Sequence, residues 1–206
     1  MKEEHKERYM VPCNEWWKCP DLIAAKNLRM VPSFNPLSMG GVIGLVELTH
    51  ELRNRLGPGP HKMAELGSWS GESAAIFAGS RIFNKLHCID IWRQPEYEGL
   101  CEYRLRSFIH EGIVEMHHAS MFDKAADFED GSLDFVYLDA DHTLEETMQA
   151  IPLWLPKVRP DGCLGGHDYN EKCWPGVVEG VTRSFAGKTP ALFMDTSWLF
   201  SIPLEA

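Results

Sequence analysis

The feature that most constrains the fold is the stretch of residues 63–73, in which a short apolar run leads through a glycine-containing turn into a helix. Residues 63–66 predict a buried strand, Gly67 and Gly71 permit a tight turn, and residues 74–78 predict a helix that the intervening serines could cap. A strand, tight turn and helix in this order commonly form the cradle of a nucleotide-type ligand. The alternative is an ordinary strand-to-helix turn of an α/β domain.

The composition of this turn favours one class of ligand. A dinucleotide fingerprint needs a second glycine two residues after the first, and Trp69 stands there. A P-loop would end in Gly-Lys-Ser/Thr, and this turn has no lysine. Glu65, at the end of the predicted strand, would repel an anion but suits a ligand with an ammonium and a sulfonium. That is the charge pattern of S-adenosylmethionine.

Length and charge narrow the possible partners. The 206 residues suffice for one domain with a sizeable core, and the formal net charge of -10 argues against nucleic acid or an anionic membrane as the main partner. The sequence has no apolar leader at its start and no run of membrane-spanning length, so we expect a cytoplasmic protein. The oligomeric state stays open between a monomer and a homo-oligomer.

The six cysteines lack Cys-x-x-Cys spacing, which favours reduced thiols over a disulfide framework or a zinc ribbon. A metal site made of Cys163, His167 and Cys173 is a less favoured possibility.

Strand-like and helix-like segments alternate along the chain, which predicts a mostly parallel sheet. We expect an arm or lid at 1–37, where Trp16 and Trp17 either cover a pocket or pack the arm on the core, and a main domain at 38–206. A helix is expected to end near Gly57. After the first strand we expect strands at 85–92, 113–117, 133–138 and 163–166, helices at 74–78, 97–110, 143–155 and 176–185, a turn at 157–162, and two strands about a tight turn within 191–202.

Two further candidate groups lie near the carboxyl ends of the second and third strands, at the edge where ligands bind in open α/β sheets. Asp90 lies 19 positions beyond Gly71, where an acid accepts hydrogen bonds from ribose hydroxyls, unless it only caps the next turn. Residues 119–121 follow the third strand and could surround an adenine with small side chains.

A second polar group follows the fourth and fifth strands. Asp139, Asp141 and His142 come after the fourth strand, and His167 and Asp168 after the fifth. Because these two strands are expected to be neighbours, Asp139 should face the His167/Asp168 pair across the mouth of the sheet. Asp141 and His142 have a simpler alternative role, which is to cap the helix that begins near residue 143.

Together these motifs resemble the class I S-adenosylmethionine-dependent methyltransferases, and most closely the small-molecule O-methyltransferases that include macrocin O-methyltransferase-like and antibiotic-sugar enzymes. The resemblance covers about residues 38–202 and rests on residues 65–73, 138–142 and 166–169. It implies an α/β, Rossmann-like fold with a seven-stranded, mostly parallel sheet, helices on both faces and a C-terminal antiparallel hairpin.

The resemblance also assigns roles. It implies a metal site at Asp139, His167 and Asp168, and Asp141 as the general base, with His142 as the second choice. It implies a cofactor site formed by Met39, Glu65, Gly67, Ser68, Gly71, Ser73, Asp90, Ala119, Ser120, Met121 and Asp139.

The expected reaction is the metal-assisted methylation of a hydroxyl on a sugar or another small polyhydroxylated metabolite. A metal at Asp139 and Asp168 would acidify the acceptor hydroxyl and orient it towards the sulfonium methyl. His167 departs from the family pattern of an acid or asparagine, so Mg²⁺ competes with Mn²⁺ and other nitrogen-accepting ions, unless Asn170 supplies an oxygen instead. The catechol-type enzymes use a lysine near this site that this sequence lacks, which argues against a catechol as the acceptor.

Two other functions are compatible with part of this pattern. A nicotinamide-dependent oxidoreductase could use a similar sheet, but Trp69 and Glu65 argue against it. The other is a non-catalytic binding module that kept the fold. The carboxylates gathered at the strand ends argue against it, because a non-catalytic domain has no physical reason to place charges together there.

Overall fold

The structure is a computed structural model that describes residues 39–203, with side chains from residue 42 onward. The predicted arm at 1–37, with Trp16 and Trp17, lies outside the described residues. Met39 is the first residue of a helix, but its side chain also lies outside the described part. In the described part of the chain, no helix is both long and apolar enough to cross a bilayer.

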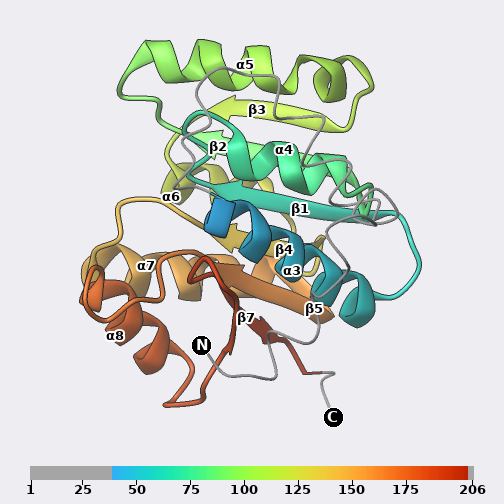
Figure 1. The fold of residues 1–206 in the computed structure, drawn as a ribbon. Coiled ribbons are helices and arrows are strands. Elements are labelled where there is room, and N and C mark those ends of the chain that lie inside the picture. The colour runs from blue at the N-terminus through green and yellow to red at the C-terminus, as the bar shows by residue number, and fades with distance from the viewer. Residues whose placement is uncertain (1–38, 204–206) are drawn as a thin grey trace.

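The described residues form a seven-stranded sheet with the order β3-β2-β1-β4-β5-β7-β6 (Figure 1). Strands β1 to β5 run parallel, whereas β7 is antiparallel to both β5 and β6. This confirms the predicted mostly parallel sheet with a C-terminal hairpin. The strands are β1 (His61–Leu66), β2 (Phe83–Asp90), β3 (Val114–His118), β4 (Leu133–Leu138), β5 (Val158–Gly166), β6 (Ala191–Leu192) and β7 (Trp198–Ser201).

Helices cover both faces of the sheet and bury one hydrophobic cluster on each side. Phe77, Phe83 and Phe135 belong to the first cluster, under α3, α4 and α5, while Trp154 and Trp198 belong to the second, under α7 and α8. The helices are α3 (Met39–Leu56), α4 (Glu72–Gly79), α5 (Pro95–His110), α6 (Met121–Lys124), α7 (Leu144–Trp154) and α8 (Pro175–Ser184). A parallel sheet buried on both faces explains why residues 63–66 of β1 and 135–137 of β4 are buried one after another.

The prediction of a turn at 157–162 is wrong, because these residues belong mostly to β5. Val158 pairs with Leu133, and the next pair is Phe135 with Cys163, so residues 159–162 bulge out of the ladder. Asp161 takes the left-handed conformation with φ of 63°. The bulge accommodates a proline and a glycine that would be unfavourable in a regular central strand.

The prediction that a serine caps α4 is also wrong. Gly71 is the residue before the first turn, with φ of 76° and no capping side chain. A side chain there would press on Cys101, so both the backbone conformation and the space favour glycine. Helix α7 is capped by Thr143, whose hydroxyl accepts a hydrogen bond from the Glu146 amide, 3.1 Å away. Asp141 and His142 therefore do not cap α7, and this frees their side chains for other contacts.

Candidate functional site

A cavity of about 820 Å³ opens at the carboxyl ends of the parallel strands, where the strand order reverses between β1 and β4. Its size lies within the range of small-molecule sites. Neither Glu65 nor Gly71 lines it. The residues singled out from the sequence that do line it are Gly67, Ser68, Ser73, Asp90, Ala119, Ser120, Met121, Asp139, Asp141, His142, His167 and Asp168.

The turn after β1 forms one wall of the cavity. Gly67 has φ of 90°, and its amide donates to the Ile89 carbonyl at 2.8 Å. A Cβ atom at this position would overlap the Asp139 carbonyl oxygen. Glycine is therefore required both for the backbone conformation and for the close approach of this turn to the end of β4.

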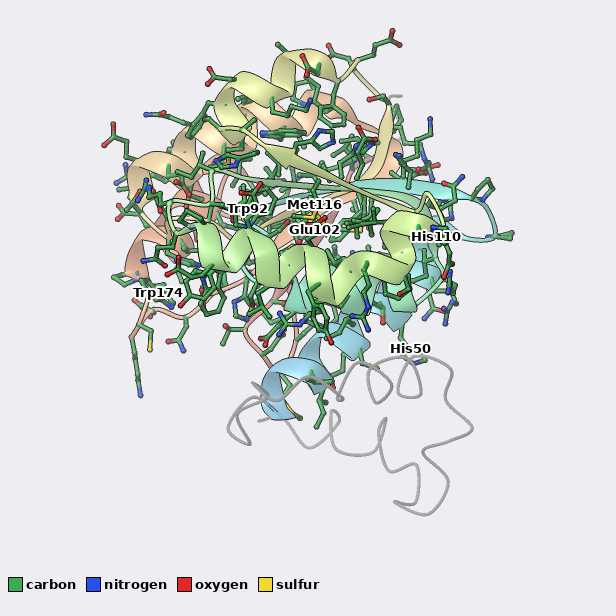
Figure 2. All side chains as sticks on the ribbon, turned by 90° about the horizontal axis from the view of Figure 1, so that it is seen from above. His50, Trp92, Glu102, His110, Met116 and Trp174 are labelled. Atoms are coloured by element: carbon green, nitrogen blue, oxygen red, sulfur yellow. The ribbon has the colours of Figure 1, made fainter. Side chains whose placement is uncertain are left out.

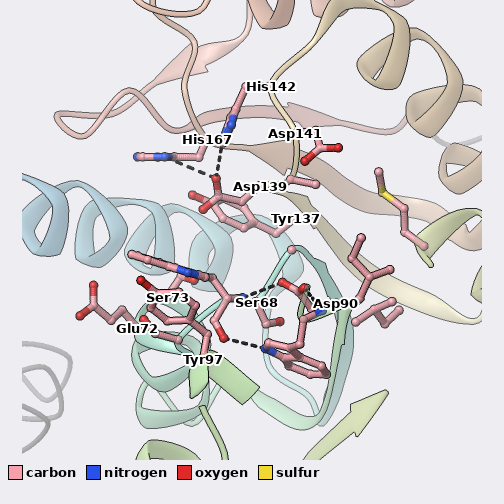
Figure 3. Close-up of a pocket in the computed structure, with 18 of the residues that line it drawn as sticks. Ser68, Glu72, Ser73, Asp90, Tyr97, Tyr137, Asp139, Asp141, His142 and His167 are labelled. Atoms are coloured by element: carbon pink, nitrogen blue, oxygen red, sulfur yellow. Dashed lines mark hydrogen bonds and ion pairs between the residues drawn. The ribbon is translucent and has the colours of Figure 1, made fainter. Parts of the chain in front are cut away.

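Asp90 ties the turn after β1 to the turn after β2. One of its carboxylate oxygens accepts from the Trp69 amide at 2.8 Å and the other from the Trp92 amide at 2.7 Å (Figure 3). The Trp92 indole in turn donates to the Trp69 carbonyl at 2.7 Å. Each Asp90 oxygen keeps a lone pair that can accept a bond from a ligand hydroxyl in the cavity.

Glu65 is completely buried next to this wall. Among the described residues, neither of its carboxylate oxygens nor the buried Ser68 hydroxyl has a hydrogen-bond partner at normal distance. Burial raises the pKa of Glu65 to about 7, although the nearby Ser68 and Ser73 hydroxyls partly offset the effect. Buried acceptors without donors are costly, so this corner is suited to a group that brings an ammonium or a hydrogen-bond donor.

Acids and imidazoles from the ends of β4 and β5 meet on the opposite wall. Figure 3 shows His142 and His167 pointing towards the Asp139 carboxylate. His142 Nε2 lies 3.2 Å from Asp139 Oδ1 and 2.7 Å from Asp168 Oδ2, while His167 Nδ1 lies 3.6 Å and 3.4 Å from the same oxygens. The expected meeting of Asp139 with His167 and Asp168 is therefore present. We call these four residues the acid–imidazole cluster.

Opposite charges hold this cluster together. Burial alone would lower the pKa of His142, but hydrogen bonds to Asp139 and Asp168 outweigh it and raise that pKa to about 9. The same two acids raise the pKa of His167 to about 11 against the effect of burial. The imidazoles in turn hold the pKa of Asp168 well below its usual range. Both imidazoles are therefore cationic at neutral pH and lie where the two acids attract positive charge.

The donor atoms also fit a divalent metal ion. Asp139, His142 and Asp168 each offer an atom within 4.8 Å of the others, so His142 joins this compact group where the sequence pointed to His167. Mixed oxygen and nitrogen donors suit Mn²⁺, Fe²⁺ or Zn²⁺ better than Mg²⁺. Cys163 is buried in the core and Cys173 is exposed, and neither belongs to a potential metal group of the described residues.

Asp195 is a member of the site that the sequence analysis missed. It lies between β6 and β7 with a side chain only 1% exposed, and its Oδ2 lies 3.8 Å from His167 Nε2. It accepts hydrogen bonds from the amide and hydroxyl of Ser197 at 3.0 and 2.8 Å. His167 is thus held between Asp195 on one ring nitrogen and the cluster acids on the other. The hairpin turn offers no periodic signal that could have revealed this role.

Asp141 and His142 are neighbours in sequence but point to different partners. The Asp141 carboxylate, about half exposed, pairs with Arg93 at 3.1 Å, and its amide donates to Glu146 at 2.7 Å. His142 has φ of 58°, which turns its ring towards the cluster, where it packs on Trp174 at 4.5 Å between ring centroids. Sequence reasoning also missed several cavity-lining residues: Glu72, Trp92, Arg93, Tyr97, Tyr137 and Glu146.

Comparison with solved structures identifies the fold. A protein from Corynebacterium glutamicum matches with a TM-score of 0.61 at 14% identity over 99% of this chain and 96% of its own. A Staphylococcus aureus protein described as a candidate caffeoyl-CoA O-methyltransferase matches with a TM-score of 0.63 at 14% identity over 97% and 99%. A TDP-rhamnose 3'-O-methyltransferase of calicheamicin biosynthesis matches with a TM-score of 0.62 at 12% identity over 97% and 90%.

A comparison with curated proteins gave no match. The family model described as "Methyltransferase domain" matches residues 64–169, just over half of the chain, from the strand before the cradle to the end of the acid–imidazole cluster. The chain therefore belongs to the methyltransferase-domain family of S-adenosylmethionine-dependent enzymes.

Proposed function

We propose that this methyltransferase is an O-methyltransferase that modifies a hydroxyl of a sugar or another small, neutral polyhydroxylated metabolite, assisted by a divalent metal at Asp139 and Asp168. One observation carries the proposal. The glycine cradle with Asp90 and the acid–imidazole cluster line the same cavity of about 820 Å³, which leaves room for a methyl donor and an acceptor side by side.

The donor side of the cavity fits S-adenosylmethionine. The unpartnered Ser68 hydroxyl lines the cavity and could accept a hydrogen bond from an ammonium, with the buried Glu65 carboxylate close to that hydroxyl. Asp90 has acceptor capacity left for ribose hydroxyls. When bound, S-adenosylmethionine supplies a methyl group on a sulfonium, which leaves as a neutral thioether. The protein's part is to fix the donor beside the acid–imidazole cluster and to exclude water from it. Trp92, almost fully buried against the turn after β1, contributes to excluding water on that side.

The acceptor side is rich in negative charge. Arg93 is the one lysine or arginine among the described lining residues, and with the His142 and His167 imidazoles it faces seven carboxylates: Glu72, Asp90, Asp139, Asp141, Glu146, Asp168 and Asp195. The carboxylates therefore still outnumber the cationic groups. Such a surface repels phosphates and carboxylates, whereas its many acceptor oxygens can bind hydroxyls. This argues for a neutral polyol or sugar, and against an acceptor that carries a nucleotide or coenzyme A.

Asp139 and Asp168 would hold the metal, with His142 or His167 as a nitrogen ligand. When bound, a divalent ion supplies positive charge that lowers the pKa of a nearby hydroxyl. Asp141 is the better general base, because its carboxylate lines the cavity free of the cluster. His142 is a poorer one, since the two acids that it contacts hold its proton with a pKa of about 9.

The test is methyl transfer from labelled S-adenosylmethionine to a panel of neutral sugars and polyols, nucleotide-linked sugars, catechols and coenzyme A thioesters. Each acceptor is assayed after chelation and after addition of Mg²⁺, Mn²⁺ or Zn²⁺. We expect turnover on a neutral polyol that chelation abolishes and Mn²⁺ restores. Turnover that survives chelation would remove the metal from the mechanism, and exclusive turnover of an anionic acceptor would overturn the substrate class.

A further inference from the structure

A second group of metal-ligating side chains lies on the sheet surface away from the acid–imidazole cluster. It consists of His87 on β2 and of Glu115 and His117 on β3, the edge strand in Figure 1. Parallel pairing sets His87 beside Glu115, and Glu115 and His117 are two residues apart, so all three side chains project from one face. Met116, labelled in Figure 2, points to the other face and packs against the hydrophobic cluster under α5.

The donor atoms of this group have the spacing of a first coordination shell. His87 Nδ1 lies 3.0 Å from His117 Nε2 and 3.9 Å from Glu115 Oε2, and His117 Nε2 lies 3.7 Å from Glu115 Oε1. Bonds of about 2.0–2.2 Å in a tetrahedral zinc site separate the donors by about 3.3–3.6 Å. The observed distances, which involve both Glu115 oxygens, bracket this value, so small side-chain rotations would make the two ring nitrogens and one carboxylate oxygen converge on one ion.

The surroundings of the two rings hold them in place. The rings stack with centroids 5.2 Å apart, and the edge of Phe128 packs against His87 at 5.0 Å. The side chains of His87 and His117 are only 17% and 12% exposed. Burial lowers the pKa of His117 and brings that of His87 to about 4. The Glu115 carboxylate is about half exposed, so solvent can complete the coordination.

Two lysines oppose an ion at this position. Lys85 Nζ lies 2.8 Å from Glu115 Oε2, and Lys124 is close enough to affect both histidines, although it pairs with Asp127 at 2.7 Å. Lys85 engages one carboxylate oxygen and leaves Oε1 on the side of His117. Its ammonium therefore weakens binding of a cation but does not occupy the position between the donors.

We propose that His87, Glu115 and His117 form a second metal site that binds Zn²⁺ or a similar nitrogen-preferring divalent ion, with solvent as the fourth ligand. The ion clamps the edge strand β3 to β2. Because β3 leads directly into the cavity-lining residues 119–122, the clamp also steadies that wall of the methyltransferase site.

The test is calorimetric titration of Zn²⁺ into chelator-stripped, tag-free protein, with melting temperature as a second readout. The background is Asp168→Asn, which weakens the acid–imidazole cluster and isolates the second site. In that background we expect one site whose affinity falls at least tenfold with His117→Ala or His87→Gln, and Zn²⁺ should no longer raise the melting temperature of these variants. His118→Ala is the matched control, because the adjacent, half-exposed His118 pairs with Glu98 and should leave affinity unchanged.

A gain-of-function variant guards against loss through misfolding. Lys85→Gln removes the competing ammonium and should tighten Zn²⁺ binding several-fold. If His117→Ala, His87→Gln and the parent bind Zn²⁺ identically, or if Lys85→Gln does not improve binding, the group is only a hydrogen-bonded histidine pair beside a surface ion pair, and the proposal is wrong.

Discussion

His142 Nε2 lies 2.7 Å from Asp168 Oδ2, across the gap between the ends of β4 and β5. The same nitrogen lies 3.2 Å from Asp139, so one imidazole bridges two carboxylates that would otherwise repel each other. A position between two acids attracts either an imidazolium or a metal ion. This relationship makes the cluster the most informative part of the cavity to test.

Asp168→Asn should lower turnover by about 10²–10⁴-fold while S-adenosylhomocysteine still raises the melting temperature as in the wild type. The neutral amide attracts the imidazolium groups or a metal ion much less than the carboxylate does, whereas the cradle for the donor does not involve Asp168 and should stay intact. Steady-state kinetics and ligand thermal shift measure the two effects. Asp130→Asn, a surface change, is the control. Equal loss of ligand binding would place Asp168 in the donor site instead.

Asp90→Ala should raise the KM for S-adenosylmethionine by about 10–100-fold and change kcat less, because two amide bonds and the proposed ribose contacts are lost. Asp90→Asn keeps one carbonyl oxygen and should fall between the wild type and the alanine variant. Isothermal titration with S-adenosylhomocysteine measures the affinity directly. An alanine variant with wild-type affinity would show that Asp90 only holds the two turns together.

Gly67→Ala should destabilise the fold much more than Gly57→Ala. Both glycines have positive φ, 90° and 73°, so an L-residue is strained at either position by about 1–2 kcal/mol. Only at Gly67 would the added Cβ also overlap the Asp139 carbonyl, whereas nothing lies within 4 Å of a Cβ at Gly57. Urea denaturation compares the free energies of unfolding. Equal losses would mean that the turn can move away from β4.

Glu65→Gln should remove part of the pH dependence of stability. Burial raises the pKa of Glu65 from 4.5 to about 7, so in this interval the folded protein keeps a proton that the unfolded chain has lost. The stability contributed by this group is complete below about pH 4.5 and is lost as the pH rises through about 7. The glutamine variant should therefore gain about 2–3 kcal/mol relative to the wild type between about pH 5 and pH 8.

Denaturant unfolding of the ligand-free protein at both pH values measures the gain for Glu65→Gln. Glu171→Gln, an exposed change, should show none. If both variants follow the wild type at each pH, Glu65 has a partner that keeps it ionised.

The strand and helix pattern of this protein could be predicted from sequence wherever local chemistry decides it. The run 133–138 is apolar except for Asp134 and became β4 with those bounds. Asp139 and His167 follow adjacent parallel strands, which must end at the same edge of the sheet. The turn at 157–162 was mispredicted, because a bulge depends on what the neighbouring strand can pair with. The prediction that a serine caps α4 also depended on a distant segment. Gly71 stands before the helix because Cys101 leaves no space for a side chain there.

Partners within the site were decided by the tertiary structure. Asp195 reaches His167 from 28 residues away only because β7 pairs antiparallel with β5, and no local pattern records that pairing. His142 enters the cluster and Asp141 leaves it towards Arg93 because His142 takes a left-handed backbone conformation. Periodicity and motifs determined which edge of the sheet holds the chemistry. Which atoms meet there depends on backbone angles and packing between distant segments, and only the folded chain sets these.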